Sequence, residues 1–161
     1  MIHYEEPSKT IKIMAKTDVL VVGSGPAGLC AALASARAGA STMLVERFGS
    51  FGGNITQAMV CAISWYRREN TIDAGGIGVE FERRAKEMGA SHKDPEGDGE
   101  LLDSDMFKYV ADVLIQEAGV TPLLHCMVTD VIMDGDTITG IITESKSGRQ
   151  AIMAKRFIDA T

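Results

Sequence analysis

The sequence predicts an α/β fold in which a parallel sheet with helices is joined to a three-stranded β-meander. Two observations at the start of the chain predict the parallel part. An apolar strand, an alanine-rich helix and a second apolar strand follow in order, and a glycine-rich turn joins the first strand to the helix. Later in the chain, short apolar runs alternate with glycine-containing turns, which is the pattern of consecutive antiparallel strands.

The first elements form a strand–helix–strand unit. Asp18 to Val22 is rich in β-branched residues and is followed by a glycine, so it is a predicted buried strand. Pro26 to Gly39 is crowded with alanine, which favours a helix, and its final glycine ends the helix. Thr42 to Glu46 is the second predicted strand. We expect residues 1–16 to be a partly ordered lead-in and residues 17–161 to form the domain.

The middle of the chain is less regular. Residues 55–72 show no clear period and are predicted to be irregular with some helix. A helix is predicted between Gly76 and Gly89, because its apolar residues fall on one face. Residues 91–100 are polar and contain proline and glycine, so we expect a surface loop there.

The last part of the chain returns to regular elements. Asp103 or Ser104 is expected to cap a helix that runs to Gly119, and Thr121 to Leu124 is a predicted third strand. The three strands of the meander are predicted at Val128 to Met133, Thr137 to Thr143 and Arg149 to Ala154, and a final strand is predicted at Arg156 to Ala160.

Composition excludes several classes of function. The 161 residues are 45% hydrophobic and carry a formal charge of -6, which argues against sequence-independent binding to nucleic acid. The absence of a long apolar run argues against a membrane span or a signal peptide, so we expect a cytoplasmic protein. Cys30, Cys61 and Cys126 lack the spacing of a zinc site or a disulfide framework, and we expect packed thiols and no metal.

The main indication of function is the segment Gly23-Ser24-Gly25-Pro26-Ala27-Gly28. It has the GxGxxG spacing between a predicted strand and a predicted helix, where such a turn binds a pyrophosphate at the N-terminus of the helix. Glu46 falls at the end of the second strand, where a carboxylate can accept hydrogen bonds from the ribose hydroxyls of a dinucleotide and would repel a 2′-phosphate. The motif alone serves both NAD and FAD.

The chain from about Asp18 to Thr161 resembles the FAD-dependent oxidoreductases of the glutathione-reductase and fumarate-reductase type. The resemblance rests on the segment VVGSGPAG, on LVERFGSFGGNIT with its glutamate and Gly-Gly loop, and on the meander that ends in Ala-Thr. It implies a Rossmann-like FAD-binding fold. Members of that family are longer, so we expect the chain to stop within their Ala-Thr-Gly motif, to lack a substrate domain and to be inactive alone.

The resemblance also implies which residues hold FAD. The glycine turn would bind the pyrophosphate, Glu46 the adenosine ribose, and Arg47 and Val128 would lie by the adenine. The loop around Asn54 would run under the ribityl chain, and the chain end would close on the phosphates. The implied contacts are Gly23, Ser24, Gly25, Pro26, Ala27, Gly28, Glu46, Arg47, Gly52, Gly53, Asn54, Thr56, Val128, Ala160 and Thr161.

The expected function is therefore the FAD-binding portion of a flavin-dependent oxidoreductase, in which a hydride passes between a small-molecule substrate or nicotinamide and the flavin. No acid or base is singled out for the chemical step, and a homo-oligomer is left open. Two alternatives stand beside this reading. One is a catalytically incomplete fragment that binds FAD or another nucleotide. The other is an NAD-dependent dehydrogenase, which the Gly-Gly-Asn loop and the meander disfavour.

Other residues admit two readings each. Cys61 follows the Gly-Gly loop and could act in redox chemistry, but no second cysteine or basic partner is near it in sequence, which favours a packed thiol. The segment Arg67-Arg68-Glu69 is either a solvated charged run or a contact for an acidic substrate or partner. Trp65 and Tyr66 belong either to the core or to an interface.

Overall fold

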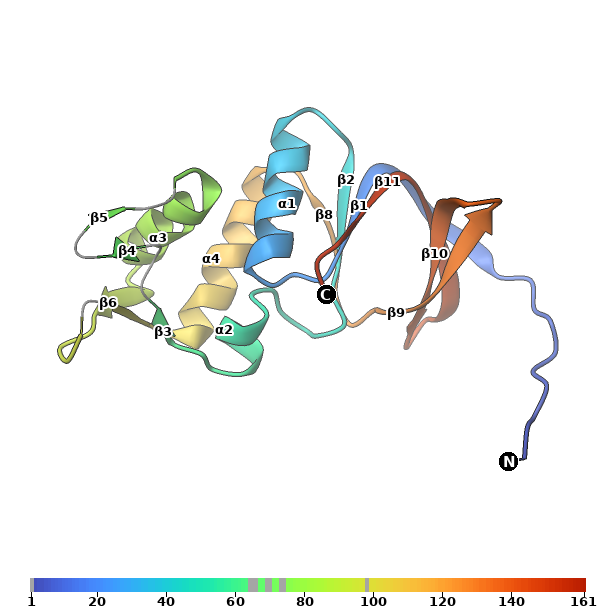
Figure 1. Cartoon of the computed structure of the whole chain (residues 1–161), viewed down its shortest axis with the longest axis horizontal. Coiled ribbons are helices and arrows are strands. Elements are labelled where there is room, and N and C mark those ends of the chain that lie inside the picture. The colour runs from blue at the N-terminus through green and yellow to red at the C-terminus, as the bar shows by residue number, and fades with distance from the viewer. Residues whose placement is uncertain (1, 64–66, 69–70, 73–74, 98) are drawn as a thin grey trace.

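A computed structural model describes residues 2–63, 67–68, 71–72, 75–97 and 99–161. Trp65, Tyr66 and Glu69 lie outside these residues, and the side chains of Arg67 and Arg68 are outside the description. The two interpretations given for each of them therefore stay predictions. Figure 1 shows three regions along the long axis: helices at one end, the parallel sheet in the middle, and the β-meander at the other end.

In the described part of the chain, the main sheet is six-stranded and mixed. Its order is β8-β2-β1-β11-β10-β9, and the pairs from β8 to β11 are parallel whereas the meander pairs are antiparallel. This arrangement confirms the predicted fold class. The strands are β1 (Lys12–Val22), β2 (Thr42–Val45), β8 (Thr121–Leu123), β9 (Met127–Asp134), β10 (Thr137–Ser145) and β11 (Gly148–Asp159).

Two long strands, β1 and β11, join the parallel sheet to the meander. They pair in parallel from Lys12 opposite Gln150 to Val22 opposite Asp159, with one irregularity between Ile13 and Ala15. The second half of β1 also pairs with β2, while the first half of β11 pairs with β10. The meander is therefore a continuation of the parallel sheet.

Two predicted strand boundaries are wrong for the same reason. The first strand begins at Lys12 and not at Asp18, and a single strand replaces the predicted pair at 149–154 and 156–160. At the first place, Ile13, Met14 and Ala15 stand between polar or charged residues and none of the residues 12–17 is buried. At the second place, exposed Lys155 and Arg156 interrupt the apolar residues, so neither place offers a continuous apolar run. Their strand conformation comes from the pairing of β1 with β11, which is a contact between distant parts of the chain.

The helices cover one face of the parallel sheet (Figure 1). They share a buried cluster with the sheet, to which Leu29, Leu33, Phe107 and Leu114 contribute, and the Phe81 and Phe107 rings lie 6.0 Å apart. Asp103 caps the last helix as predicted, because its carboxylate accepts hydrogen bonds from two amides of the first turn. The helices are α1 (Pro26–Arg37), α2 (Asn54–Gln57), α3 (Ile77–Glu87) and α4 (Ser104–Glu117).

Short strands replace part of the predicted loop at 91–100, so that prediction is wrong at both ends. β6 (Ser91–Lys93) and β7 (Glu100–Leu102) form a hairpin, to which β3 (Ala62–Ile63) adds a third strand. The hairpin is held by burial of Leu102, which a polar stretch does not reveal. The irregular segment 55–72 contains α2 and β3, together with the pair β4 (Arg67–Arg68) and β5 (Thr71–Ile72).

No helix among the described residues is long and apolar enough to cross a membrane.

Asp18 ties three strands together at one point of the sheet. Its carboxylate accepts hydrogen bonds from the amide (3.1 Å) and the hydroxyl (2.8 Å) of Ser41, just before β2, and it pairs with Lys155 of β11 at 2.6 Å. The hydrogen bond from Lys155, followed by those from Ser41, lowers the pKa of Asp18 from 3.8 to about 2.

This lowered pKa predicts an acid-dependent stability. The Asp18 carboxylate stabilises the fold above its unfolded pKa of 3.8, and this contribution is lost as the pH falls through about 2. Asp18→Asn should therefore lower the melting temperature above pH 4, and its deficit relative to wild type should shrink towards pH 2. Thermal unfolding followed by circular dichroism across this range measures it. Asp136→Asn, in the exposed turn between β9 and β10, is the control, and an equal deficit at all pH values would contradict the linkage.

A candidate nucleotide-binding cleft at the start of helix α1

A cleft of about 730 Å³ opens where β1 and β2 end and α1 begins. Val22 and Val45, the last residues of these strands, line it together with the chain that follows β11. This is the edge at which parallel α/β sheets bind ligands. All but three of the predicted contacts line the cleft: Gly23, Ser24, Gly25, Pro26, Ala27, Glu46, Arg47, Gly53, Asn54, Val128, Ala160 and Thr161.

The three glycines of the GxGxxG turn differ in whether the fold itself requires a glycine at that position. Gly23 has φ +90°, and a Cβ there would lie 2.6 Å from the carbonyl oxygen of Ala160. A Cβ on Gly28 would lie 1.9 Å from the carbonyl oxygen of Gly23, so the close contact of α1 with the turn excludes any side chain. At Gly25, in contrast, φ is −63° and no described heavy atom lies within 4 Å of an added Cβ. Neither the backbone nor the packing therefore requires a glycine at position 25.

The N-terminus of α1 faces the same space. Pro26 occupies the first turn, where a missing N–H costs no hydrogen bond, and the first intrahelical bond runs from the Leu29 amide to the Gly25 carbonyl at 2.9 Å. The amides of Ala27 and Gly28 precede that bond and have no partner within the helix. Together with the helix dipole, these donors make the space above Gly25 favourable for an anion.

Ser24 holds the Glu46 carboxylate at the floor of the cleft. Its amide and hydroxyl both donate to Oε2, at 2.9 and 2.6 Å, and the Phe48 amide donates to Oε1 at 3.0 Å. Both Ser24 and Glu46 are buried. A carboxylate has about four acceptor positions, so Oε1 keeps the capacity to accept one more hydrogen bond from a ligand.

The connection between β8 and β9 forms the wall next to Glu46. The amide of Cys126 donates to the Glu46 carbonyl at 3.0 Å, and the amide of His125 donates to the Phe48 carbonyl at 2.9 Å. The Arg47 guanidinium lies 4.6 Å from the centre of the Phe48 ring, at the open side of this wall. Sequence analysis placed Arg47 and Val128 here, and the structure brings them into one cleft.

The cleft also contains residues that sequence analysis missed. They are Val22, Val45, Phe48, Gln57, Ala58, Cys126 and Met127. Phe48 could have been found, since an aromatic residue stands two positions after the predicted ribose-binding glutamate. Cys126 and Met127 enter the cleft through the pairing of β8 with β2, for which the sequence has no local signal.

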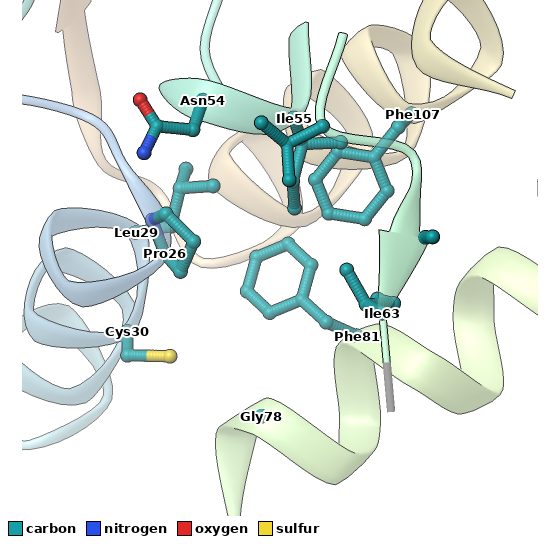
Figure 2. A pocket seen from close by; sticks show the side chains of 11 residues that line it. Pro26, Leu29, Cys30, Asn54, Ile55, Ile63, Gly78, Phe81 and Phe107 are labelled. Atoms are coloured by element: carbon teal, nitrogen blue, oxygen red, sulfur yellow. The ribbon is translucent and has the colours of Figure 1, made fainter. Parts of the chain in front are cut away.

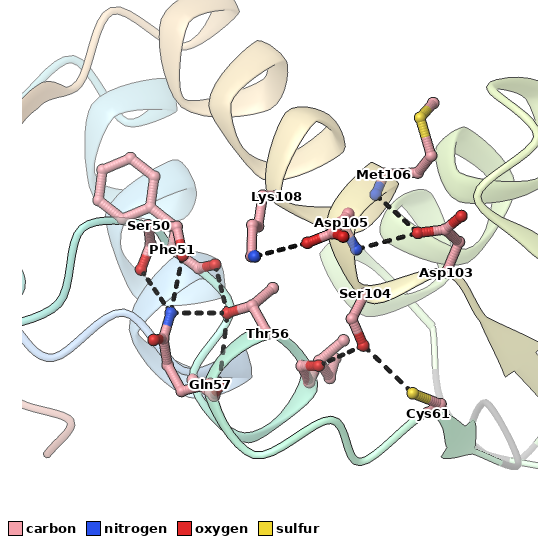
Figure 3. Close-up of polar contacts among 12 residues, drawn as sticks. Ser50, Phe51, Thr56, Gln57, Cys61, Asp103, Ser104, Asp105, Met106 and Lys108 are labelled. Carbon is pink, nitrogen blue, oxygen red and sulfur yellow. Dashed lines mark hydrogen bonds and ion pairs between the residues drawn. The ribbon is translucent and has the colours of Figure 1, made fainter.

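The Gly-Gly-Asn loop is fixed on both sides, and Figure 3 shows the contacts of Thr56 and Ser104 on one of these sides. The Gly52 amide donates to the Ser24 carbonyl at 2.9 Å, and a Cβ on Gly53 would lie 2.6 Å from the Cα of Gly25. The Thr56 hydroxyl donates to the Phe51 carbonyl at 2.7 Å and does not line the cleft. Ser104, at the start of α4, donates to the Ile55 carbonyl at 2.8 Å and anchors α2. The loop is thereby held against the glycine turn of residues 23–28.

Three predicted contacts have packing roles in this structure. Gly28 packs on the turn, Gly52 packs on the Thr56 side chain, and Thr56 bonds to its own loop. Their assignment as cofactor contacts stays a prediction. Cys61 lies outside the cleft, with Sγ 3.2 Å from the Ser104 hydroxyl at the contact of α2 with α4.

Comparison with known proteins identifies the class to which this fold and cleft belong. A family model described as FAD dependent oxidoreductase matches residues 18–161. The chain therefore belongs to the FAD-dependent oxidoreductase family and corresponds to the FAD-binding region of its flavoenzymes. The family match favours FAD over NAD, a choice that the glycine turn left open.

Individual relatives differ in what their names describe. The chain is 31% identical to a thiamine thiazole synthase of Methanococcus vannielii, with 92% of the chain and 57% of that protein covered. It is 30% identical to digeranylgeranylglycerophospholipid reductase 1 of Methanopyrus kandleri, over 89% of the chain and 39% of that protein. The solved 3-ketosteroid-delta4-(5alpha)-dehydrogenase of Rhodococcus jostii shares the fold, with a TM-score of 0.63, 17% identity, and 92% of the chain and 46% of that structure covered. The chain thus spans about half the length of the proteins it resembles.

The bonds from Ser24 to Glu46 predict a stability effect. Ser24→Ala should lower the free energy of unfolding by about 1.5–3 kcal/mol, because the buried Glu46 carboxylate loses a hydrogen bond from a hydroxyl. Chemical denaturation of both proteins measures the difference. Ser35→Ala, on α1 away from the cleft, is the matched control and should change stability little. An equal loss in both variants would contradict a specific role for the Ser24 hydroxyl.

Proposed function

We propose that this chain binds FAD in the cleft and is the cofactor-binding part of a flavin-dependent oxidoreductase that acts on a small molecule. The observation that carries the proposal is the open space at Gly25. Gly23 and Gly28 are required by contacts within the chain, whereas a Cβ on Gly25 would meet no described atom and would project into the cleft. A glycine that the fold does not need indicates close approach of a ligand to the backbone.

The cleft offers a group for each part of the cofactor. The free amides at the start of α1 would bind the pyrophosphate, and Glu46 Oε1 would accept a hydrogen bond from an adenosine ribose hydroxyl. The Arg47 and Phe48 pair and Val128 would flank the adenine, while Gly53 and Asn54 would lie towards the flavin. Bound FAD would supply the capacity to accept or donate a hydride, and the protein would bind and orient it.

Family membership sets the cofactor class but not the substrate. The names of the relatives include a thiazole synthase and a lipid reductase, which share the cofactor-binding region and act on different compounds. The substrate of this protein is therefore to be sought in the residues that surround the flavin end of the cleft.

Substitution of single glycines separates cofactor binding from folding. Gly25→Ala should keep the melting temperature of the wild type but lower FAD affinity by about ten- to a hundredfold, since overpacking against a bound group costs about 1–3 kcal/mol. Gly75→Ala is the matched control, because an added Cβ there also meets no described atom within 4 Å and the residue is outside the cleft. FAD titration followed by flavin fluorescence, with thermal unfolding in parallel, gives both quantities.

Gly28→Ala should give the opposite result, with a large loss of stability, because its Cβ would overlap the Gly23 carbonyl. Equal FAD affinity of wild type and Gly25→Ala would contradict the placement of the pyrophosphate. The absence of FAD binding to wild type at high micromolar concentration would contradict the proposed function of the chain.

A further inference from the structure

A second cavity, of about 550 Å³, lies next to the nucleotide cleft. Side chains from α1, α2, α3 and α4 surround it, together with residues that follow α2 (Figure 2). This volume is within the range of about 300–1,000 Å³ that small-molecule sites occupy. The lining residues are Pro26, Leu29, Cys30, Asn54, Ile55, Val60, Ala62, Ile63, Gly78, Phe81 and Phe107.

The lining is apolar and uncharged. The paired Phe81 and Phe107 rings and the Ile55 and Leu29 side chains face the cavity in Figure 2. None of the described lining residues is an acid or a base. Burial raises the pKa of the Cys30 thiol, which keeps this group neutral as well. The part of a ligand that lies in this cavity must therefore be uncharged, since a charged group would lose its hydration without gaining an oppositely charged partner.

The two cavities share a wall. Pro26 and Asn54 line both of them, and these residues stand at the start of α1 and of α2. Asn54 is exposed, and its side-chain amide makes no hydrogen bond to any residue in the part of the chain that the structure describes. Figure 2 shows this amide at the edge of the cavity, directed away from the Phe81 and Phe107 rings. It provides one donor and one acceptor group at the junction of an apolar cavity with the cofactor cleft.

We propose that this cavity binds the apolar body of an uncharged substrate whose single polar group, such as a carbonyl, is held by the Asn54 amide. The inference rests on the proposed function, because Asn54 lies at the flavin end of the FAD cleft. The apolar walls supply affinity through burial of the hydrocarbon part, and the amide fixes which end of the molecule faces the cofactor.

The test uses 2-decanone as the probe, with its affinity measured by saturation-transfer NMR on the chain. Ala62→Trp fills the cavity from β3, since Ala62 lines it and is itself exposed. This variant should weaken 2-decanone binding by about tenfold or more. Ala34→Trp places the same bulk on an exposed position of α1 that lines neither cavity, and it should bind as wild type does. Val60→Trp fills the cavity from a second exposed position and repeats the test if the first variant is poorly folded.

A charged probe of similar length tests the substrate class. Decanoate should bind about tenfold or more weakly than 2-decanone, because no described lining residue carries a positive charge to pair with its carboxylate. Equal binding of the two probes would overturn the uncharged class. Equal binding of 2-decanone to wild type and to both filled variants, or no binding to wild type, would overturn the site itself.

FAD affinity, measured in the same variants, separates this inference from the proposed function. Ala62 does not line the nucleotide cleft, so Ala62→Trp should bind FAD as wild type does. A chain that binds 2-decanone in this cavity but does not bind FAD would refute the proposed function and leave the apolar site supported. A chain that binds FAD but not 2-decanone would refute only the apolar site.

Discussion

Close contact between backbone segments at the start of α1 is the constraint on which the rest of the site depends. The turn after β1 touches the end of β11 at Gly23 and Ala160, and α1 touches the turn at Gly28, with no room for a Cβ at either glycine. This contact brings the amides of the helix, the ends of the parallel strands and the last residues of the described chain to one point. A cleft with donors on one side and Glu46 on the other follows from it.

The second organising feature is the pairing of β1 with β11. Because β11 pairs with β1 of the parallel sheet on one side and with β10 of the meander on the other, the two parts of the molecule form one hydrogen-bonded sheet. The meander is thus held in a fixed position relative to the cleft, and β9 can bring Met127 and Val128 to its wall. Residues 12–16, which were expected to belong to a lead-in, form the first part of β1 and take part in this pairing.

The features that could be predicted from the sequence are those that neighbouring residues determine. The glycine spacing between an apolar run and an alanine-rich segment predicted the tight turn from β1 into α1, and Asp103 was one of two residues predicted to start α4, since both features depend on neighbouring residues. Two features lay beyond such reasoning: the hairpin of β6 with β7, and the entry of Cys126 into the cleft. Each depends on pairing between segments whose polar or short sequences have no period of their own.

The hydrogen bonds of Glu46 have a consequence for recognition. Ser24 and Phe48 orient this carboxylate in the folded chain. The entropy cost of fixing the Glu46 side chain is therefore part of folding and does not reduce the affinity for a ligand. The acceptor is preorganised: its direction is set before a nucleotide arrives. In the proposed site, discrimination among nucleotides would then depend on how well their hydroxyls fit one fixed direction of the Glu46 carboxylate.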